Sequence, residues 1–406
     1  MTKNKFFLLA LAIVAMLCCT TSCSDMTEAD DSLISKPMHE VTLTFDLGLN
    51  ARLSTRAFAQ RPLESSDNWQ RVNSVRVYAF RSDTEAGTYT YYKPMEGGVE
   101  QNYIYVSAFS GKDAVYTQEP FEEHEYLSAT LTFADGWYKF VAIGREDING
   151  DDNTGSQWNF TALTAGVTTM DALTAGTTSG SAACTELFIG QTDGVEVTTA
   201  KPIHETITLF RVVAGVLMYV ENIPSEISST PVATVGIVRR KHTSGLTLLS
   251  PVANGSETIW AAEGSDLVGL TPAATDYIVK SGNLTSATVS NGYYVGTSPL
   301  NSAHPNSVRH GAFVTPQAAP SADNTLELVL CDASGVVLQA RHIKLVASNG
   351  ATVTPTLLYP LVANNIYCIG KYNETEGTDD PIDLGDVPTD VILVHGSWQA
   401  DVNIEM

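Results

Sequence analysis

The chain has 406 residues, and its 45 Asp and Glu outnumber its 23 Lys and Arg, which gives a formal net charge of −22 at pH 7. A strongly acidic surface repels phosphate backbones, so nucleic acid is not an expected partner. A chain of this length exceeds one ordinary compact domain and favours two domains, each with its own core.

The amino terminus has the pattern of a lipoprotein signal peptide. Lys3 and Lys5 precede an apolar run over residues 6–17 that is too short to span a membrane stably. Small residues then lead to Cys23, in a sequence that resembles the lipobox cut by lipoprotein signal peptidase. An ordinary secretory signal is the alternative, but its small residues would be poorly placed for cleavage. We therefore predict a signal peptide over residues 1–22 and a lipid on Cys23.

Residues 23–37 are polar and acidic, which predicts a flexible tether. The stretch also resembles the surface-export signal of Bacteroidetes lipoproteins, and a plain solvated tether explains it equally well. The remaining cysteines, Cys184, Cys331 and Cys368, are too few and too scattered for a disulfide framework or a zinc site. We interpret them as small buried hydrophobic residues.

Apolar and polar residues alternate over residues 41–49, which predicts a half-buried first strand. Gly, Asp, Asn and Pro separate further strand-like runs at residues 75–80, 89–92, 103–109, 127–133 and 138–143. This spacing favours a β-sandwich over residues 38–200. A segment rich in Thr, Ala and Gly at residues 161–183 has no strong period, and we expect a short helix or a long loop there.

A long strand-like run at residues 203–220 is expected to open a second sandwich over residues 201–406. Its later strands are predicted at residues 235–239, 246–249, 276–279, 325–331, 335–345 and 365–372. Helical periodicity is scarce throughout. The sequence therefore predicts an all-β fold of two tandem sandwiches.

Five short motifs occur in a fixed order: the lipobox, the alternating first strand, Ser54-Thr55-Arg56-Ala57, the strand at residues 209–214 and the strand at residues 364–367. Together they resemble the fimbrillins, the shaft, tip and anchor subunits of the type V pili of Bacteroidetes. The resemblance implies two transthyretin-like β-sandwich domains, lipoprotein export to the outer membrane and cell surface, and a structural role in a fimbrium that supports adhesion.

The resemblance also implies assembly by strand exchange. An arginine-specific protease would cut after Arg56 and release the first strand, and a strand from another subunit would fill the vacant place by β-augmentation. The displaced strand would present Val41, Leu43, Phe45, Leu47 and Leu49. The donor strand would present Trp398, Ala400, Val402 and Ile404, although this tail and the apolar run at residues 391–394 serve equally well as the last strands of the chain's own sandwich. Without the resemblance, Arg56 is an ordinary solvated charge.

The role within the pilus stays open. An anchor would keep its lipid and its first strand, whereas a shaft subunit would lose both, and the intact alternating tail argues against a tip subunit. The implied partners are other pilus subunits, the outer membrane through the lipid, and a host or bacterial surface ligand.

No nucleophile elbow, zinc-protease helix or P-loop is found in the sequence, so we predict a protein that is not an enzyme and needs no cofactor. Residues 147–153 resemble a calcium loop but carry Asp152 in place of the turn glycine and Trp158 in place of the bidentate glutamate, which favours a polar hairpin without metal. The rival function is a glycan-binding surface lipoprotein. It would need a platform of two or three coplanar exposed aromatic rings, drawn from Trp69, Trp137, Trp158 and Trp260.

Overall fold

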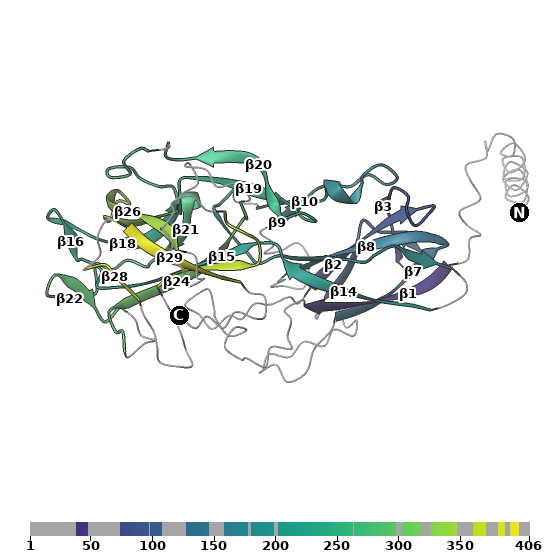
Figure 1. Ribbon diagram of the computed structural model, residues 1–406, viewed down its shortest axis with the longest axis horizontal. Coiled ribbons are helices and arrows are strands. Elements are labelled where there is room, and N and C mark those ends of the chain that lie inside the picture. Colours follow the sequence, from purple (N-terminus) through teal and green to yellow (C-terminus); the bar gives the residue numbers. More distant parts are fainter. Residues whose placement is uncertain are drawn as a thin grey trace, which may run out of the picture.

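The computed structural model is almost entirely β-strand in the part of the chain that it describes. The described residues are 38–47, 74–96, 98–107, 127–145, 158–177, 180–198, 202–262, 264–297, 303–317, 326–346, 360–370, 381–385 and 390–397. Within them the helical segments are two short 3-10 turns, η2 (Met170–Ala172) and η3 (Ala274–Asp276). The all-β prediction is confirmed for these residues, and two large sheets lie at opposite ends of an elongated molecule (Figure 1).

The first large sheet has eleven strands in the order β3-β2-β8-β12-β14-β1-β7-β4-β5, with β13 added beside β8 and β6 beside β2. Their bounds are β1 (Met38–Leu47), β2 (Ser74–Ser82), β3 (Thr90–Tyr92), β4 (Met95–Glu96), β5 (Val99–Glu100), β6 (Ile104–Ser107), β7 (Leu127–Ala134), β8 (Gly136–Arg145), β12 (Phe188–Gln191), β13 (Val195–Val197) and β14 (Ile203–Arg211).

This sheet closes on itself around one core, because strands from its two ends face each other. Apolar side chains of β1, β7 and β14 pack in a single cluster with those of β2, β6, β8 and β13. Strand β14 joins the two halves, since its first seven residues pair with β1 while Phe210 and Arg211 pair with β12. The result is a β-sandwich.

The second large sheet has ten strands in the order β11-β24-β15-β27-β29-β26-β25-β18-β21, with β28 beside β15. Their bounds are β11 (Ala183–Cys184), β15 (Ala214–Glu221), β18 (Thr234–Arg239), β21 (Tyr277–Lys280), β24 (Ser307–Val314), β25 (Leu326–Cys331), β26 (Val337–Val346), β27 (Asn365–Ile369), β28 (Ile382–Asp383) and β29 (Asp390–Ser397).

Strand β15 explains why the second half contains a long continuous apolar run. Val216 and Met218 face the main core of the second sheet, whereas Leu217 and Tyr219 belong to a smaller cluster on the opposite face. A strand that is covered on both faces has no polar face to present to water, so it loses the alternation of a half-buried strand.

A four-stranded sheet joins the two halves of the chain. It has the order β20-β19-β10-β9, with β9 (Trp158–Phe160) and β10 (Thr174–Thr177) from the first half and β19 (Lys241–Thr247) and β20 (Val252–Ile259) from the second. In Figure 1 it lies above the junction of the two large sheets. Two small hairpins, β16 (Glu226–Ile227) with β17 (Thr230–Pro231) and β22 (Thr288–Ser290) with β23 (Tyr293–Val295), complete the described strands.

Two segments hold strands that the sequence did not indicate. Residues 161–183 include, in their described part, a short 3-10 helix, η2, which agrees with one of the two expectations, and also β10 and the start of β11. The run at residues 203–220 is two strands, because the chain leaves the first sheet after Arg211 and enters the second at Ala214. Strand β14, which the sequence analysis assigned to the second domain, therefore pairs in the first sheet.

Candidate functional site

Strand β1, the candidate displaced strand, lies inside the first sheet and has a neighbour on each side. It pairs antiparallel with β7 from Met38 opposite Ala134 to Phe45 opposite Leu127. It pairs parallel with β14 from Val41 to Leu47, which lies opposite Leu209. The backbone N–H and C=O groups on both edges of β1 are therefore hydrogen-bonded to neighbouring strands along most of its length.

The apolar face of β1 points into the sandwich. Val41 and Leu43 are fully buried and Phe45 is 3% exposed, and all three belong to the main core cluster of the first sheet. On the other face Thr42 and Thr44 are partly exposed. Leu47 ends the strand, and Leu49 lies outside the described residues.

Two polar contacts support the register of β1 against β7. The Thr42 and Thr130 hydroxyl oxygens lie 3.1 Å apart across the β1–β7 pair. At the beginning of the strand, the Nε2 atom of His39 lies 2.7 Å from a carboxylate oxygen of Asp135. The register matters because a shift by one residue would turn the three buried apolar side chains toward solvent.

The place occupied by β1 has the properties of a strand-binding slot. Each of its large buried side chains contributes about 1.5–3 kcal/mol by leaving water. If β1 left, β7 and β14 would each present an unpaired edge beside an apolar trough, and any replacement would need apolar residues at every second position.

Strand β29 near the carboxyl terminus has the same kind of neighbours as β1. It is parallel to β26, from His342 opposite Asp390 onward, and antiparallel to β27, from Asn365 opposite Ser397 onward. The run at residues 391–394 therefore pairs within its own chain. The candidate donor residues Trp398, Ala400, Val402 and Ile404 follow β29 directly and lie outside the described residues, as do Cys23 and Arg56.

The three tryptophans among the described residues do not form the platform that a glycan-binding surface would need. Trp158 is 3% exposed and packs in the cluster between β8 and β19, together with the partly buried Trp137. Trp260 packs against a different cluster, and its Nε1 donates to the backbone oxygen of Arg239 at 2.7 Å. Trp69 lies outside the described residues, as does the loop at residues 147–153.

The cysteine prediction is confirmed. Cys184, Cys331 and Cys368 are free and buried, and burial raises the pKa of the Cys184 thiol above its ordinary value. In the described part of the chain, no group of three or more His, Cys, Asp or Glu side chains is placed to hold a metal ion. No helix among the same residues combines the length and the apolar character needed to cross a bilayer.

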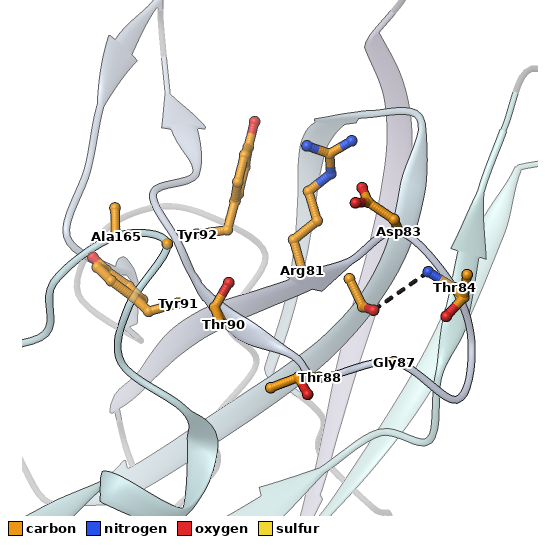
Figure 2. Close-up of a pocket in the computed structure, with 11 residues that line it drawn as sticks. Arg81, Asp83, Thr84, Gly87, Thr88, Thr90, Tyr91, Tyr92 and Ala165 are labelled. Carbon is orange, nitrogen blue, oxygen red and sulfur yellow. Dashed lines mark hydrogen bonds between the residues drawn. The ribbon is translucent and has the colours of Figure 1, made fainter.

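One hollow was not anticipated from the sequence. A pocket of about 470 Å³ lies between the β2–β3 turn and the turn at residues 165–166 (Figure 2). Its lining combines Arg81 and Asp83 with hydroxyl side chains and the rings of Tyr91 and Tyr92. The sequence alone did not predict this pocket, because its two walls come from segments about 80 residues apart in the chain.

The model of the family described as fimbrillin-A associated anchor proteins Mfa1 and Mfa2 matches residues 35–237, half of the 406-residue chain. No curated protein matches the chain.

Among solved structures, the chain is similar to the fimbrial anchor protein Mfa2 from Porphyromonas gingivalis, at 13% identity over 89% of this chain and 98% of that one, with a TM-score of 0.40. It is also similar to a fimbrial assembly protein from Parabacteroides distasonis, at 10% identity over 84% and 94% of the two chains, with a TM-score of 0.36. These low scores add no argument to the match of the family model. The chain belongs to the family of fimbrillin-A associated anchor proteins Mfa1 and Mfa2.

Proposed function

We propose that this protein is a structural subunit of a cell-surface pilus that is exported as a lipoprotein and joins a neighbouring subunit at the position of β1. Membership of a family of fimbrial anchor-associated proteins supports a structural role in a pilus and gives no support to an enzyme. The single observation that carries the assembly proposal is the environment of β1, which is hydrogen-bonded on both edges and apolar on the face that enters the core.

Export follows from the amino-terminal motifs. Residues 1–22 are a signal peptide, the lipid on Cys23 attaches the exported chain to the outer membrane, and residues 23–37 are the tether. Replacing Cys23 by Ala should abolish incorporation of radiolabelled palmitate and release the protein from the membrane fraction. Palmitate incorporation that persists in Cys23→Ala would contradict this part of the proposal.

Assembly proceeds by exchange of strands between transthyretin-like sandwiches, with the boundary between the two near residues 211–214, because β14 pairs with β1 and β12. Cleavage after Arg56 removes β1, and the incoming strand lies antiparallel to β7 and parallel to β14, as β1 does. The donor is the segment that carries Trp398, Ala400, Val402 and Ile404, because it supplies an apolar residue at every second position.

A second candidate role is the anchor, which keeps both its lipid and β1. The description of the matching family as anchor proteins favours it. Val41 and Leu43 of β1 are fully buried, which is compatible with a first strand that stays in its own sheet.

Treatment of the purified chain, starting after Cys23, with an arginine-specific protease separates the two roles. A polymerising subunit is cut after Arg56, loses β1 and forms ordered oligomers, which mass spectrometry and light scattering detect. The matched control is Arg56→Lys, which keeps the charge but resists the protease. A chain that is not cut at Arg56 and stays monomeric favours the anchor role or a glycan-binding surface lipoprotein.

A further inference from the structure

The pocket at the β2–β3 turn is separate from the strand slot and has its own structure. The end of β2, the turn that follows it and β3 form one wall, and the turn at residues 165–166 forms the other. At about 470 Å³ it lies in the size range of sites for small molecules.

Backbone hydrogen bonds hold the two walls together, so the pocket exists without a ligand. The amide of Tyr91 donates to the oxygen of Thr168 at 2.7 Å, and the amide of Gly166 donates to the oxygen of Tyr91 at 2.9 Å. Within the turn, the amide of Thr84 donates to the hydroxyl oxygen of Ser82 at 3.3 Å, the dashed line in Figure 2. A preformed site loses little conformational entropy when a ligand binds.

The lining is polar and rich in hydroxyl groups, which come from Ser82, Thr84, Thr88 and Thr90. A hydroxyl group both donates and accepts, so such a wall complements a ligand that carries hydroxyl groups of its own. The exposed carboxylate of Asp83 adds strong acceptors, and the guanidinium of Arg81 adds donors.

Arg81 and Tyr92 are held in fixed orientations beside each other. The Nη2 atom of Arg81 donates to the backbone oxygen of Asp135 at 3.0 Å, which leaves the other Nη group for a ligand. The ring of Tyr92 meets the ring of Tyr138 edge-on, with centroids 5.5 Å apart. Figure 2 shows the side chains of Arg81, Asp83 and Tyr92 pointing to the same side of the pocket.

The charges in and around the pocket favour neutral ligands over acidic ones. Among the described residues of the lining, Arg81 is the one cation, and Asp83 offsets it, in a chain whose net charge is −22. An acidic sugar would meet repulsion from the surrounding field, whereas a neutral sugar would not. A neutral sugar ring also presents C–H groups that pack against an aromatic face such as that of Tyr92.

We propose that this pocket binds one neutral sugar unit of a surface glycan. Asp83 accepts hydrogen bonds from two sugar hydroxyls, Arg81 donates to a third oxygen, and the ring of Tyr92 carries the apolar face of the sugar. The site goes beyond the pilus role, because it gives the subunit a ligand that is not another subunit.

Saturation-transfer NMR titrations of the whole mature chain with methyl glycosides of glucose, galactose, mannose and N-acetylglucosamine test the proposal, with methyl glucuronide as the acidic comparison. We expect at least one neutral glycoside to bind saturably with a Kd of about 1 mM. Asp83→Asn should weaken this binding about tenfold, because a charged acceptor is lost. Thr90→Val, of the same shape, should weaken it about threefold.

Asp266→Asn is the matched control, since Asp266 is an exposed aspartate of the second half of the chain, and it should leave binding unchanged. Circular dichroism and thermal unfolding confirm that each variant is folded. The proposal fails if no neutral glycoside saturates below about 10 mM. It also fails if the glucuronide binds best, or if Asp83→Asn and Asp266→Asn bind alike.

Discussion

Arg211 and Glu186 form a buried ion pair where β14 ends. The Nε atom of Arg211 donates to Glu186 Oε1 at 2.6 Å, and Nη1 donates to Oδ1 of Asn364 at 3.2 Å. Neither partner is more than 7% exposed in its side chain. Burial lowers the pKa of Arg211, and the carboxylate of Glu186 opposes this shift. The charged form of Arg211 is therefore stabilised by the negative charge of Glu186.

Glu186→Gln should therefore lower the free energy of unfolding by about 3–5 kcal/mol, because it leaves a buried guanidinium without its counter-charge. Urea denaturation at neutral pH measures the change. The matched control is Glu257→Gln, which breaks the pair with Lys241 at 2.8 Å, where the glutamate is 52% exposed. That change should cost no more than about 0.5 kcal/mol, and similar losses in both variants would contradict the prediction.

His242 should make stability depend on pH. Its Nε2 lies 3.0 Å from the oxygen of Gly180, and burial, opposed by this contact, lowers the pKa of its imidazole below the ordinary value. As the pH falls below about 6.5, the unfolded chain binds a proton before the folded chain does, so stability is lost on acidification until the folded pKa is reached.

His242→Gln should reduce the loss of stability between about pH 7 and pH 5.5, although His310, whose pKa burial also lowers, keeps part of the dependence. Urea midpoints at the two pH values give the slope directly. His204→Gln, at an exposed position of β14, is the control and should leave the slope as it is. A slope that is the same in His242→Gln and the parent chain would refute the assignment.

At the scale of the element, β1 shows where sequence reasoning works and where it stops. The alternation at residues 41–49 marked Val41, Leu43 and Phe45 as one apolar face, and the structure confirms that this face is buried. The alternation did not predict which strands pair with β1. Its parallel partner β14 comes from a distant segment of the chain, and no pattern within residues 41–49 indicates that segment.

The slot occupied by β1 should accept the same strand as a separate peptide. A chain that begins at Ala57 lacks β1, so it should bind a hydrophobic dye and associate through its open edges. A synthetic peptide with residues 38–49 should restore a monomer and reduce dye fluorescence, as sizing and fluorescence titration would show. A peptide with Thr at positions 41, 43 and 45 is the control, and rescue by both peptides would mean that apolar complementarity is not what fills the slot.

At the scale of the whole molecule, the two large sheets are joined by the shared four-stranded sheet. Leu246 of β19 is fully buried and packs with Tyr78, Phe80 and Val141 of the first sheet, although it comes from the second half of the sequence. Strand β11 likewise leaves the first half of the sequence to pair with β24 in the second sheet. Because strands from each half of the sequence pack or pair with the other half, we expect the stability of the two large sheets to be coupled.

Leu246→Ala should therefore loosen the first sheet as well as its own. A buried Leu→Ala change costs about 2–5 kcal/mol, and here it opens a cavity against β2 and β8. Hydrogen exchange with mass spectrometry should show faster exchange in both strands. Leu328→Ala, in the main core of the second sheet, is the matched control and should leave β2 and β8 unchanged. Equal exchange of β2 and β8 in the two variants would show that the halves are not coupled in this way.

The sequence by itself determined the β class, the buried face of β1, the buried character of three cysteines and the resemblance to a family that the comparison then confirmed. These properties are local, because side-chain period and short motifs follow from neighbouring residues. Only the tertiary structure decided that β14 belongs beside β1, that strands of both halves share a sheet, and that Arg81 and Tyr92 line one pocket with the turn at residues 165–166. These properties depend on contacts between segments far apart in the chain, and no local pattern encodes which distant edge a strand will meet.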